Sequence, residues 1–256
     1  MIMPSPPVLG LFVFAVIILG AVAGWTIGKR LPTHHLTDET RSLVSVSMAV
    51  VGTLSALVLG LLISNANTAF GERNREITTL SANILRLDRA LRSYGSEADE
   101  ARALLQQYAE HKTADLFPEH PSDGVQVDDP STYQLLVRQE DSVLSLQPSD
   151  ARQKWWAEQA LTLAANIGNT RWLLVQQSGQ GTPKAFLALV TFWLTLLFAS
   201  FGLFAPRNAT SLVALALCAL AVSGGVEMIL EFENPFGGIV HLSPWAMRYA
   251  SGALSQ

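Results

Sequence analysis

The residues of this chain that are most able to do chemistry are acidic side chains within an apolar stretch near its C-terminus. Glu227 and Glu231 lie four residues apart and so share one face of a helix. An ionisable residue at membrane depth indicates a functional site by default, and Glu227 is the deeper of the two. Glu233 and Pro235 fall where this helix should break, because the residue before a proline avoids the helical conformation. The carboxylates either pair with arginines at the membrane interface or face a water-filled cavity.

A second group of polar residues follows the apolar stretch 43–64. Its side-chain hydroxyls and amide could replace part of an ion's hydration shell: Ser64, Asn67 and Thr68. The apolar residues just before them could form a constriction that closes by dewetting: Leu59, Leu62 and Ile63. Arg73 and Arg75 come one to two turns later, where they would attract anions at a pore entrance or anchor the helix at the membrane surface.

The same stretch carries small residues at intervals of four: Gly52, Ala56 and Gly60, followed by Ser64. Small residues at this spacing allow two helix backbones to approach closely. The pattern indicates packing against a neighbouring helix, or a helix that lines a pore. Both interpretations hold together if the chain forms an oligomer.

Motifs for enzyme chemistry are missing from the sequence. It has no phosphate-binding glycine loop, no HExxH and no GxSxG. Cys218 is the single cysteine, which excludes a disulfide framework and a cysteine zinc site, and the histidines lack metal-ligand spacing. Asp123, Asp128 and Asp129 form an acidic loop without the residue order of a calcium-binding loop. We therefore expect a solvated loop, no cofactor, no metal and no enzyme.

The polar residues must be positioned by membrane helices. The chain is 49% hydrophobic and only 15% charged, whereas a soluble domain has about a quarter charged residues. Its net charge of −4 gives no basic surface for nucleic acid. Four windows have the roughly 20 apolar residues that a bilayer requires: about 8–28, 43–64, 185–205 and 211–230. The first could be a signal peptide, but no Lys or Arg precedes it.

Charged residues concentrate in one block between the second and third windows. Of the 17 Lys and Arg residues 11 lie there, with 16 of the 21 Asp and Glu residues. We expect an all-α membrane protein with this organisation: spans one and two in 1–64, a helical soluble domain in 65–183, and spans three and four with a C-terminal interfacial segment in 184–256. Four spans place both termini on the side of the soluble block, and the Lys and Arg distribution does not decide which side that is.

The second span should continue as a helix into the soluble block. Apolar residues recur beyond it at spacings of three and four from Ile77 to Tyr94, and Gly95 should end the helix. Further helices are predicted at about 97–116, from Pro130 with Asp129 as N-cap, and to about 178 with Ser149 as N-cap. Thr182 and Pro183 should cap the third span, and Trp245 and Tyr249 suit a membrane interface.

Two stretches of this chain resemble the bestrophin-like family of bacterial membrane proteins. The first is 57–108, where a membrane helix runs through Ala-Phe-Gly-Glu-Arg-Asn-Arg into a segment rich in Leu and Arg. The second is 230–239, Leu-Glu-Phe-Glu-Asn-Pro-Phe-Gly-Gly-Ile, with Ser-Pro at 243–244, which is similar to the family's acidic-x-Pro-Phe-x-Gly ending. The resemblance implies distant kinship with bestrophins, which are oligomeric anion channels with cytoplasmic termini. It also implies five subunits, a pore lined by the second span, and a bacterial inner-membrane location.

Three functions therefore compete. The leading one is a homo-oligomeric ion channel for a small anion such as chloride, in contact with membrane lipid. The alternative is a non-conducting membrane-anchored module whose soluble block binds a partner or senses a signal. The third is a proton-coupled transporter that uses Glu227, although such folds commonly have internal repeats and broken helices, which this sequence lacks.

Overall fold

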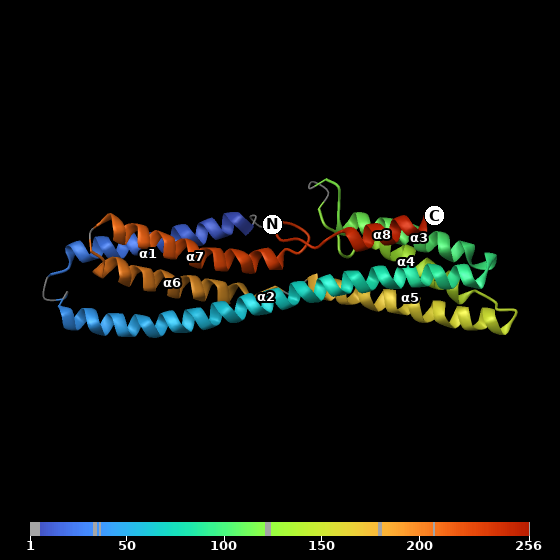
Figure 1. Ribbon diagram of the computed structural model, residues 1–256, viewed down its shortest axis with the longest axis horizontal. Helices are drawn as coiled ribbons and strands as arrows, with labels where there is room; N and C mark the ends of the chain where they lie inside the picture. The colour runs from blue at the N-terminus through green and yellow to red at the C-terminus, as the bar shows by residue number, and fades with distance from the viewer. Residues whose placement is uncertain are drawn as a thin grey trace. The chain divides into compact units, whose positions relative to one another are not determined.

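The computed structural model of the chain describes residues 6–32, 35, 37–120, 124–178, 181–206 and 208–255 (Figure 1). The described residues form helices and connecting loops, with no strand among them. They divide into two compact units. The first unit takes in Met1–Phe70 and Thr182–His241, and the second takes in Gly71–Gly181 and Leu242–Gln256.

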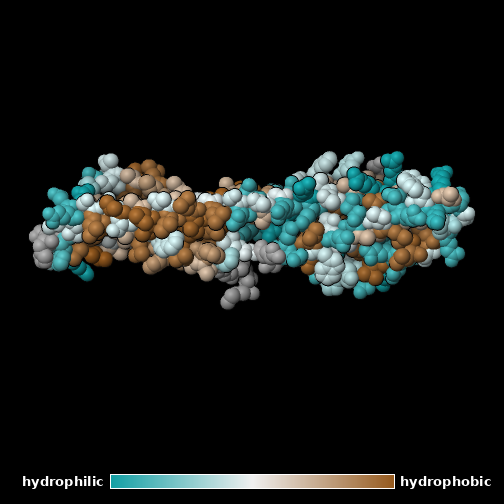
Figure 2. All heavy atoms as spheres, turned by 90° about the horizontal axis from the view of Figure 1, so that it is seen from below, coloured by the Kyte–Doolittle hydropathy of each residue, from teal (hydrophilic) through white to brown (hydrophobic). Residues whose placement is uncertain are grey.

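The first unit is built from four long apolar helices. They are α1 (Pro6–Arg30), the first part of α2 (Asp38–Tyr94), α6 (Lys184–Phe204) and α7 (Ala209–Glu233). Each is long and apolar enough to cross a membrane, as the sequence predicted. In Figure 2 the hydrophobic colouring gathers over the surface that these helices form.

Helices α1 and α6 approach each other so closely that glycines are required between them. A Cβ atom at Gly24 would overlap the backbone carbonyl oxygen of Ala199, and one at Gly202 would overlap that of Ala21. Gly20 and Gly28 continue this seam, with backbone oxygens of α6 at 2.8 and 2.9 Å from their added Cβ atoms. Three glycines at intervals of four on α1 thus form a small-residue packing face, which the sequence analysis looked for only on α2.

A side chain added at the seam should therefore separate α1 from α6. We expect Gly24→Ala to destabilise the protein by about 1–3 kcal/mol, the usual cost of overpacking, because the obstacle is backbone. Gly224→Ala is the matched control, since nothing lies within 4 Å of its added Cβ atom. It should leave stability unchanged or raise it through helix propensity. Thermal unfolding of the detergent-solubilised protein measures both, and equal effects would contradict the seam.

The second unit contains the rest of α2 and five shorter elements: η2 (Ser96–Ala98), α3 (Asp99–Leu116), α4 (Pro130–Leu144), α5 (Ala151–Ser178) and α8 (Trp245–Leu254). The predicted stripe on α2 is its core, since each of Ile77, Leu80, Ile84, Leu87, Leu91 and Tyr94 is at most 4% exposed. The long helix ends before Gly95, as predicted, and that glycine has a φ of +128°. A residue with a side chain rarely adopts this conformation.

One of the three predicted helix caps differs from the structure. The cap of α4 is confirmed, because the Asp129 carboxylate accepts hydrogen bonds from the backbone N–H groups of Ser131 and Thr132. The Ser149 prediction is wrong: α5 begins at Ala151, and Asp150 Oδ1 accepts from the Gln153 N–H at 2.6 Å. A carboxylate directly before the helix wins over a hydroxyl one residue earlier. Pro183 occupies the N-cap of α6 and makes no side-chain capping bond.

Helix α8 was not predicted. Its buried residues nevertheless recur at the three- and four-residue spacing of an amphipathic helix. Met247, Ala250 and Leu254 are buried, and α8 packs against α3 within the second unit. Trp245 and Tyr249 lie on its exposed side, with stacked rings whose centroids are 5.3 Å apart.

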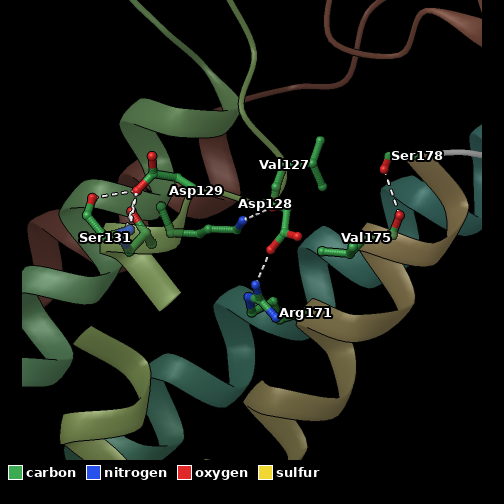
Figure 3. Close-up of polar contacts among 9 residues, drawn as sticks. Val127, Asp128, Asp129, Ser131, Arg171, Val175 and Ser178 are labelled. Atoms are coloured by element: carbon green, nitrogen blue, oxygen red, sulfur yellow. Dashed lines mark hydrogen bonds and ion pairs between the residues drawn. The ribbon is translucent and has the colours of Figure 1, made fainter. Parts of the chain in front are cut away.

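The acidic loop before α4 is held by two buried cations (Figure 3). Lys112, 1% exposed, donates from Nζ to the Val127 carbonyl oxygen at 2.6 Å. Arg171, 3% exposed, forms an ion pair with Asp128. Asp128 and Asp129 are therefore occupied by a salt bridge and a helix cap, while Asp123 lies outside the described residues. In the described part of the chain, no three acidic, His or Cys side chains are grouped to hold a metal ion.

The buried lysine gives the second unit a pH dependence. Burial lowers the pKa of Lys112 from 10.5 to about 8, against the opposing charge of Asp115. The unfolded chain therefore binds this proton more tightly between pH 8 and 10.5, and stability from this residue rises with pH across that window. Wild type should gain thermal stability relative to Lys112→Met as the pH is raised from 8 to 10. The exposed Lys154→Met is the control and should run parallel to wild type.

Candidate functional site

Helix α2 is the span that its own unit covers least. Only 11% of its most apolar window is buried, compared with 33% for α1 and 22% each for α6 and α7. The window has no charged side chain to keep it in water. Its uncovered surface therefore faces lipid or another copy of the chain.

One face of α2 points into the first unit. Leu62 and Ala66 are 8% and 5% exposed and join the core of this unit. Leu59 and Ile63 are partly buried there, with side-chain carbons 3.4 and 3.8 Å from a Cβ atom added at Gly225 of α7. The structure thus turns the three residues of the predicted constriction into the first unit, with Leu59 and Ile63 against α7 and Leu62 in the core.

The opposite face of α2 carries a different apolar stripe. Its members recur at three and four residues and are between 48% and 69% exposed: Leu43, Val46, Val50, Leu54, Leu57 and Leu61. Ser64 and Thr68 continue this spacing and are exposed, and Asn67 is exposed beside them. The sequence analysis missed Leu57 and Leu61 as neighbours of these polar residues. The signal was their three- and four-residue spacing to Ser64 and Thr68.

The small residues of α2 do not share a single environment. An added Cβ atom at Gly52 would lie 2.9 Å from Leu197 Cδ1 of α6, so Gly52 packs within the unit. Ala56 and Gly60 are exposed, and nothing lies within 4 Å of a Cβ atom added at Gly60. Within one chain, the small-residue packing prediction therefore has a close contact at Gly52 and none at Gly60.

Several hydroxyl groups along α2 donate to the helix itself. Thr53 donates to the Ala49 carbonyl oxygen at 2.9 Å, and Thr68 donates to the Ser64 carbonyl oxygen at 2.9 Å. These bonds satisfy the donors where water is absent, while leaving oxygen lone pairs available. An uncovered hydroxyl of this kind can sit in a lipid-facing or an ion-facing surface at little cost.

The two arginines after the span have different roles. Arg73 is 7% exposed, and its Nη2 donates to the Gln177 carbonyl oxygen of α5 at 2.9 Å. The spacing of Leu61, Ser64 and Thr68 continues four residues later at Glu72 and three residues after that at Arg75, which is exposed. Glu72, also exposed, lies one turn before it. The arginine available to ions is therefore Arg75, with a carboxylate close by in sequence.

Glu227 lies against a position on α1 that has no side chain. Its Oε2 and Cβ would be 3.1 and 3.0 Å from a Cβ atom added at Gly10. The residue is half-buried between α7 and α1. Gly10 thus makes the room that the Glu227 carboxylate occupies, which the sequence pattern did not reveal.

Glu231 and Glu233 bind backbone N–H groups. Glu231 is 3% exposed, and its Oε2 accepts from Ile239 N at 2.8 Å and from Val240 N at 3.1 Å. Glu233 Oε1 accepts from Thr182 N at 2.6 Å. Helix α7 ends at Glu233, so the predicted break before Pro235 is confirmed. The two carboxylates fold the segment after α7 and the segment before α6 against the helix end.

The role of Glu231 as a loop anchor can be measured directly. Glu231→Leu leaves two backbone N–H groups without their charged acceptor, and each such bond contributes about 1.5–3 kcal/mol. We expect amide hydrogen exchange at Ile239 and Val240 to accelerate by roughly tenfold or more. Glu233→Leu should instead accelerate exchange at Thr182. Identical exchange patterns in the two variants would contradict these assignments.

Comparisons with known proteins agree with this fold. The family described as Bestrophin-like domain matches residues 14–247. A crystal structure of a bacterial bestrophin homologue from Klebsiella pneumoniae, in a variant form, is similar with a TM-score of 0.67 and 17% identity, covering 96% of this chain and 97% of that chain. A second variant of it gives a TM-score of 0.67 and 15% identity, covering 99% and 98%.

A crystal structure described only as a membrane protein is also similar, with a TM-score of 0.68 and 17% identity over 95% of this chain and 96% of that one. No curated protein sequence matches the chain significantly. At these identities the structural neighbours bear on the fold, and the family match covers most of the chain. The chain is therefore a membrane protein that belongs to the Bestrophin-like family.

Proposed function

We propose that this chain is a subunit of a homo-oligomeric ion channel in a bacterial inner membrane, with the exposed face of α2 lining a central pore. The observation that carries the proposal is the uncovered stripe on α2 that changes from leucines to polar residues. Family membership supports a channel kind of function and supplies no enzyme chemistry. The resemblance to bestrophins favours five subunits, with the second unit and both termini on the cytoplasmic side.

We propose a different pair of leucines for the constriction, on the basis of their exposure in a single chain. A side chain that lines an axis between subunits has to be exposed in a single subunit. Leu57 and Leu61 meet this condition at 66% and 61% exposure, whereas Leu62 is 8% exposed. We therefore move the apolar ring from Leu59, Leu62 and Ile63 to Leu57 and Leu61. Rings of Ser64, Asn67 and Thr68 would follow it and interact with a partly dehydrated ion.

Selectivity depends on charges of opposite sign beyond the polar rings. Arg75 would raise the local concentration of anions, and Glu72 would lower it. Both Glu72 and Arg75 continue the spacing of the pore-facing stripe, so we propose anion selectivity on the resemblance to bestrophins. Arg73 contributes no free charge to this surface in the proposal, since its side chain is buried against α5.

Planar-bilayer recording of the purified protein, with its oligomeric mass measured on the same sample, tests the proposal. Discrete openings with a chloride-dominated reversal potential, from a ring-forming oligomer, are expected. A folded oligomer that is silent across voltages, lipids and salts would favour the non-conducting anchored module. Full activity of a Glu227→Gln variant would remove the proton-coupled transporter.

Two leucines on opposite faces of α2 separate the pore assignments. Leu61→Ala should raise single-channel conductance severalfold, because it widens an apolar constriction. Leu59→Ala removes the same atoms from the face that packs on α7. It should lower the free energy of unfolding by no more than the about 2–5 kcal/mol that truncating a fully buried leucine costs, and it should leave conductance unchanged. The reverse result would return the constriction to Leu59, Leu62 and Ile63.

Two charge deletions test selectivity. Arg75→Gln should lower the chloride-to-sodium permeability ratio, and Glu72→Gln should raise it, because each removes one sign of charge near the permeation path. Reversal potentials in a salt gradient measure the ratio. If neither variant changes it, the charges on this part of α2 do not face the ions.

A further inference from the structure

The first unit has an apolar pocket that the proposed pore does not use. It has a volume of about 290 Å³ and lies between the C-terminal part of α1, the end of α6 and the start of α7. One water needs only about 15 Å³ by this measure. Its lining is mainly apolar and includes Ile18, Val22, Trp25, Pro206, Leu212 and Leu215.

We propose that this pocket binds an acyl chain of an anionic phospholipid, with the lipid phosphate held by Lys29. The inference goes beyond the proposed channel, because none of the pocket residues belongs to α2. The pocket lies among membrane-spanning helices, where the surrounding solvent is hydrocarbon. A groove of this size at a lipid-facing surface is filled by whatever apolar chain fits it.

The charge around the pocket selects the kind of lipid. Trp25 lines the pocket, and Lys29 Nζ lies 3.9 Å from the centroid of its indole ring. Arg30 is the next residue and ends α1. Both cations are exposed, and none of the residues that line the pocket is acidic. The ammonium group is thus fixed beside the pocket with donors free to bind a phosphate oxygen.

The structure also accounts for a lipid rather than a soluble ligand. Apolar lining dominates, and its polar members are Asn208 and Ser211 at the beginning of α7, where Asn208 Oδ1 accepts from the Ser211 N–H at 2.8 Å. Asn208 is therefore engaged as the helix cap. The ring of Trp25, 39% exposed, is amphipathic and suited to the headgroup boundary. An acyl chain below this level and a phosphate at it match the two halves of the site.

Trp25 makes the site measurable by fluorescence quenching in the intact protein. The full chain is reconstituted with phosphatidylglycerol or phosphatidylcholine that carries brominated acyl chains, which quench tryptophan emission. The chain has six tryptophans, so the quenching due to Trp25 is obtained as the quenching of wild type minus that of Trp25→Phe. We expect Trp25 to be quenched at a lower mole fraction of brominated phosphatidylglycerol than of brominated phosphatidylcholine. Quenching of Trp25 that follows bulk mixing for both lipids would overturn the proposal.

Matched variants separate the two parts of the site. Ala209→Phe places a ring into the pocket lining, whereas Ala214→Phe adds the same ring at an exposed position of α7 outside it. The first should abolish the preferential quenching and the second should preserve it. Lys29→Gln should equalise the two lipids while acyl-chain quenching persists. If both phenylalanine variants behave alike, or if Trp25 is shielded by a second copy of the chain, the pocket is not a lipid site.

Discussion

The first unit depends on the contact in which the backbones of α1 and α6 occupy each other's side-chain space. Gly24 and Gly202 face carbonyl oxygens of the partner helix, so these two helices approach more closely than side chains would allow. Association in lipid gains nothing from hiding apolar surface, and close packing has to supply the attraction instead. With α1 committed to α6 and α7, only one face of α2 is used, and its other face stays available.

This use of a single face of α2 explains why one of its two apolar stripes is buried and the other is exposed. Leu62 meets the core of its own unit, and Leu61, the preceding residue, points away from it. In water, an exposed row of leucines would be a liability, but in a membrane it has no cost. Leu61 is followed along the same row by the exposed hydroxyl residues Ser64 and Thr68. In the proposed pore, those hydroxyls would face the permeating ion.

Local sequence rules predicted the elements well, since helices, their ends and their spans depend on neighbouring residues. The stripe from Ile77 to Tyr94, the stop at Gly95 and the cap at Asp129 are of this kind. Faces within the membrane could not be assigned this way, because both sides of α2 are apolar and periodicity alone does not say which side meets α7. The seam at Gly20, Gly24 and Gly28 was legible as spacing, yet its partner on α6 is set by tertiary contact.

The polar residues divide by the same logic. Two buried ones have partners that only the fold supplies: Glu231 accepts hydrogen bonds from the N–H groups of Ile239 and Val240, and Lys112 Nζ donates one to the Val127 carbonyl oxygen. Such groups cost several kcal/mol when they are left unpaired. Each hydrogen bond therefore fixes the conformation of a loop whose sequence alone would allow several conformations. Glu231 and Glu233, which the sequence singled out as possible functional residues, thus hold the protein's own backbone. The polar groups that stay exposed, on α2 and at Lys29, are the ones at which we propose that ions and lipids bind.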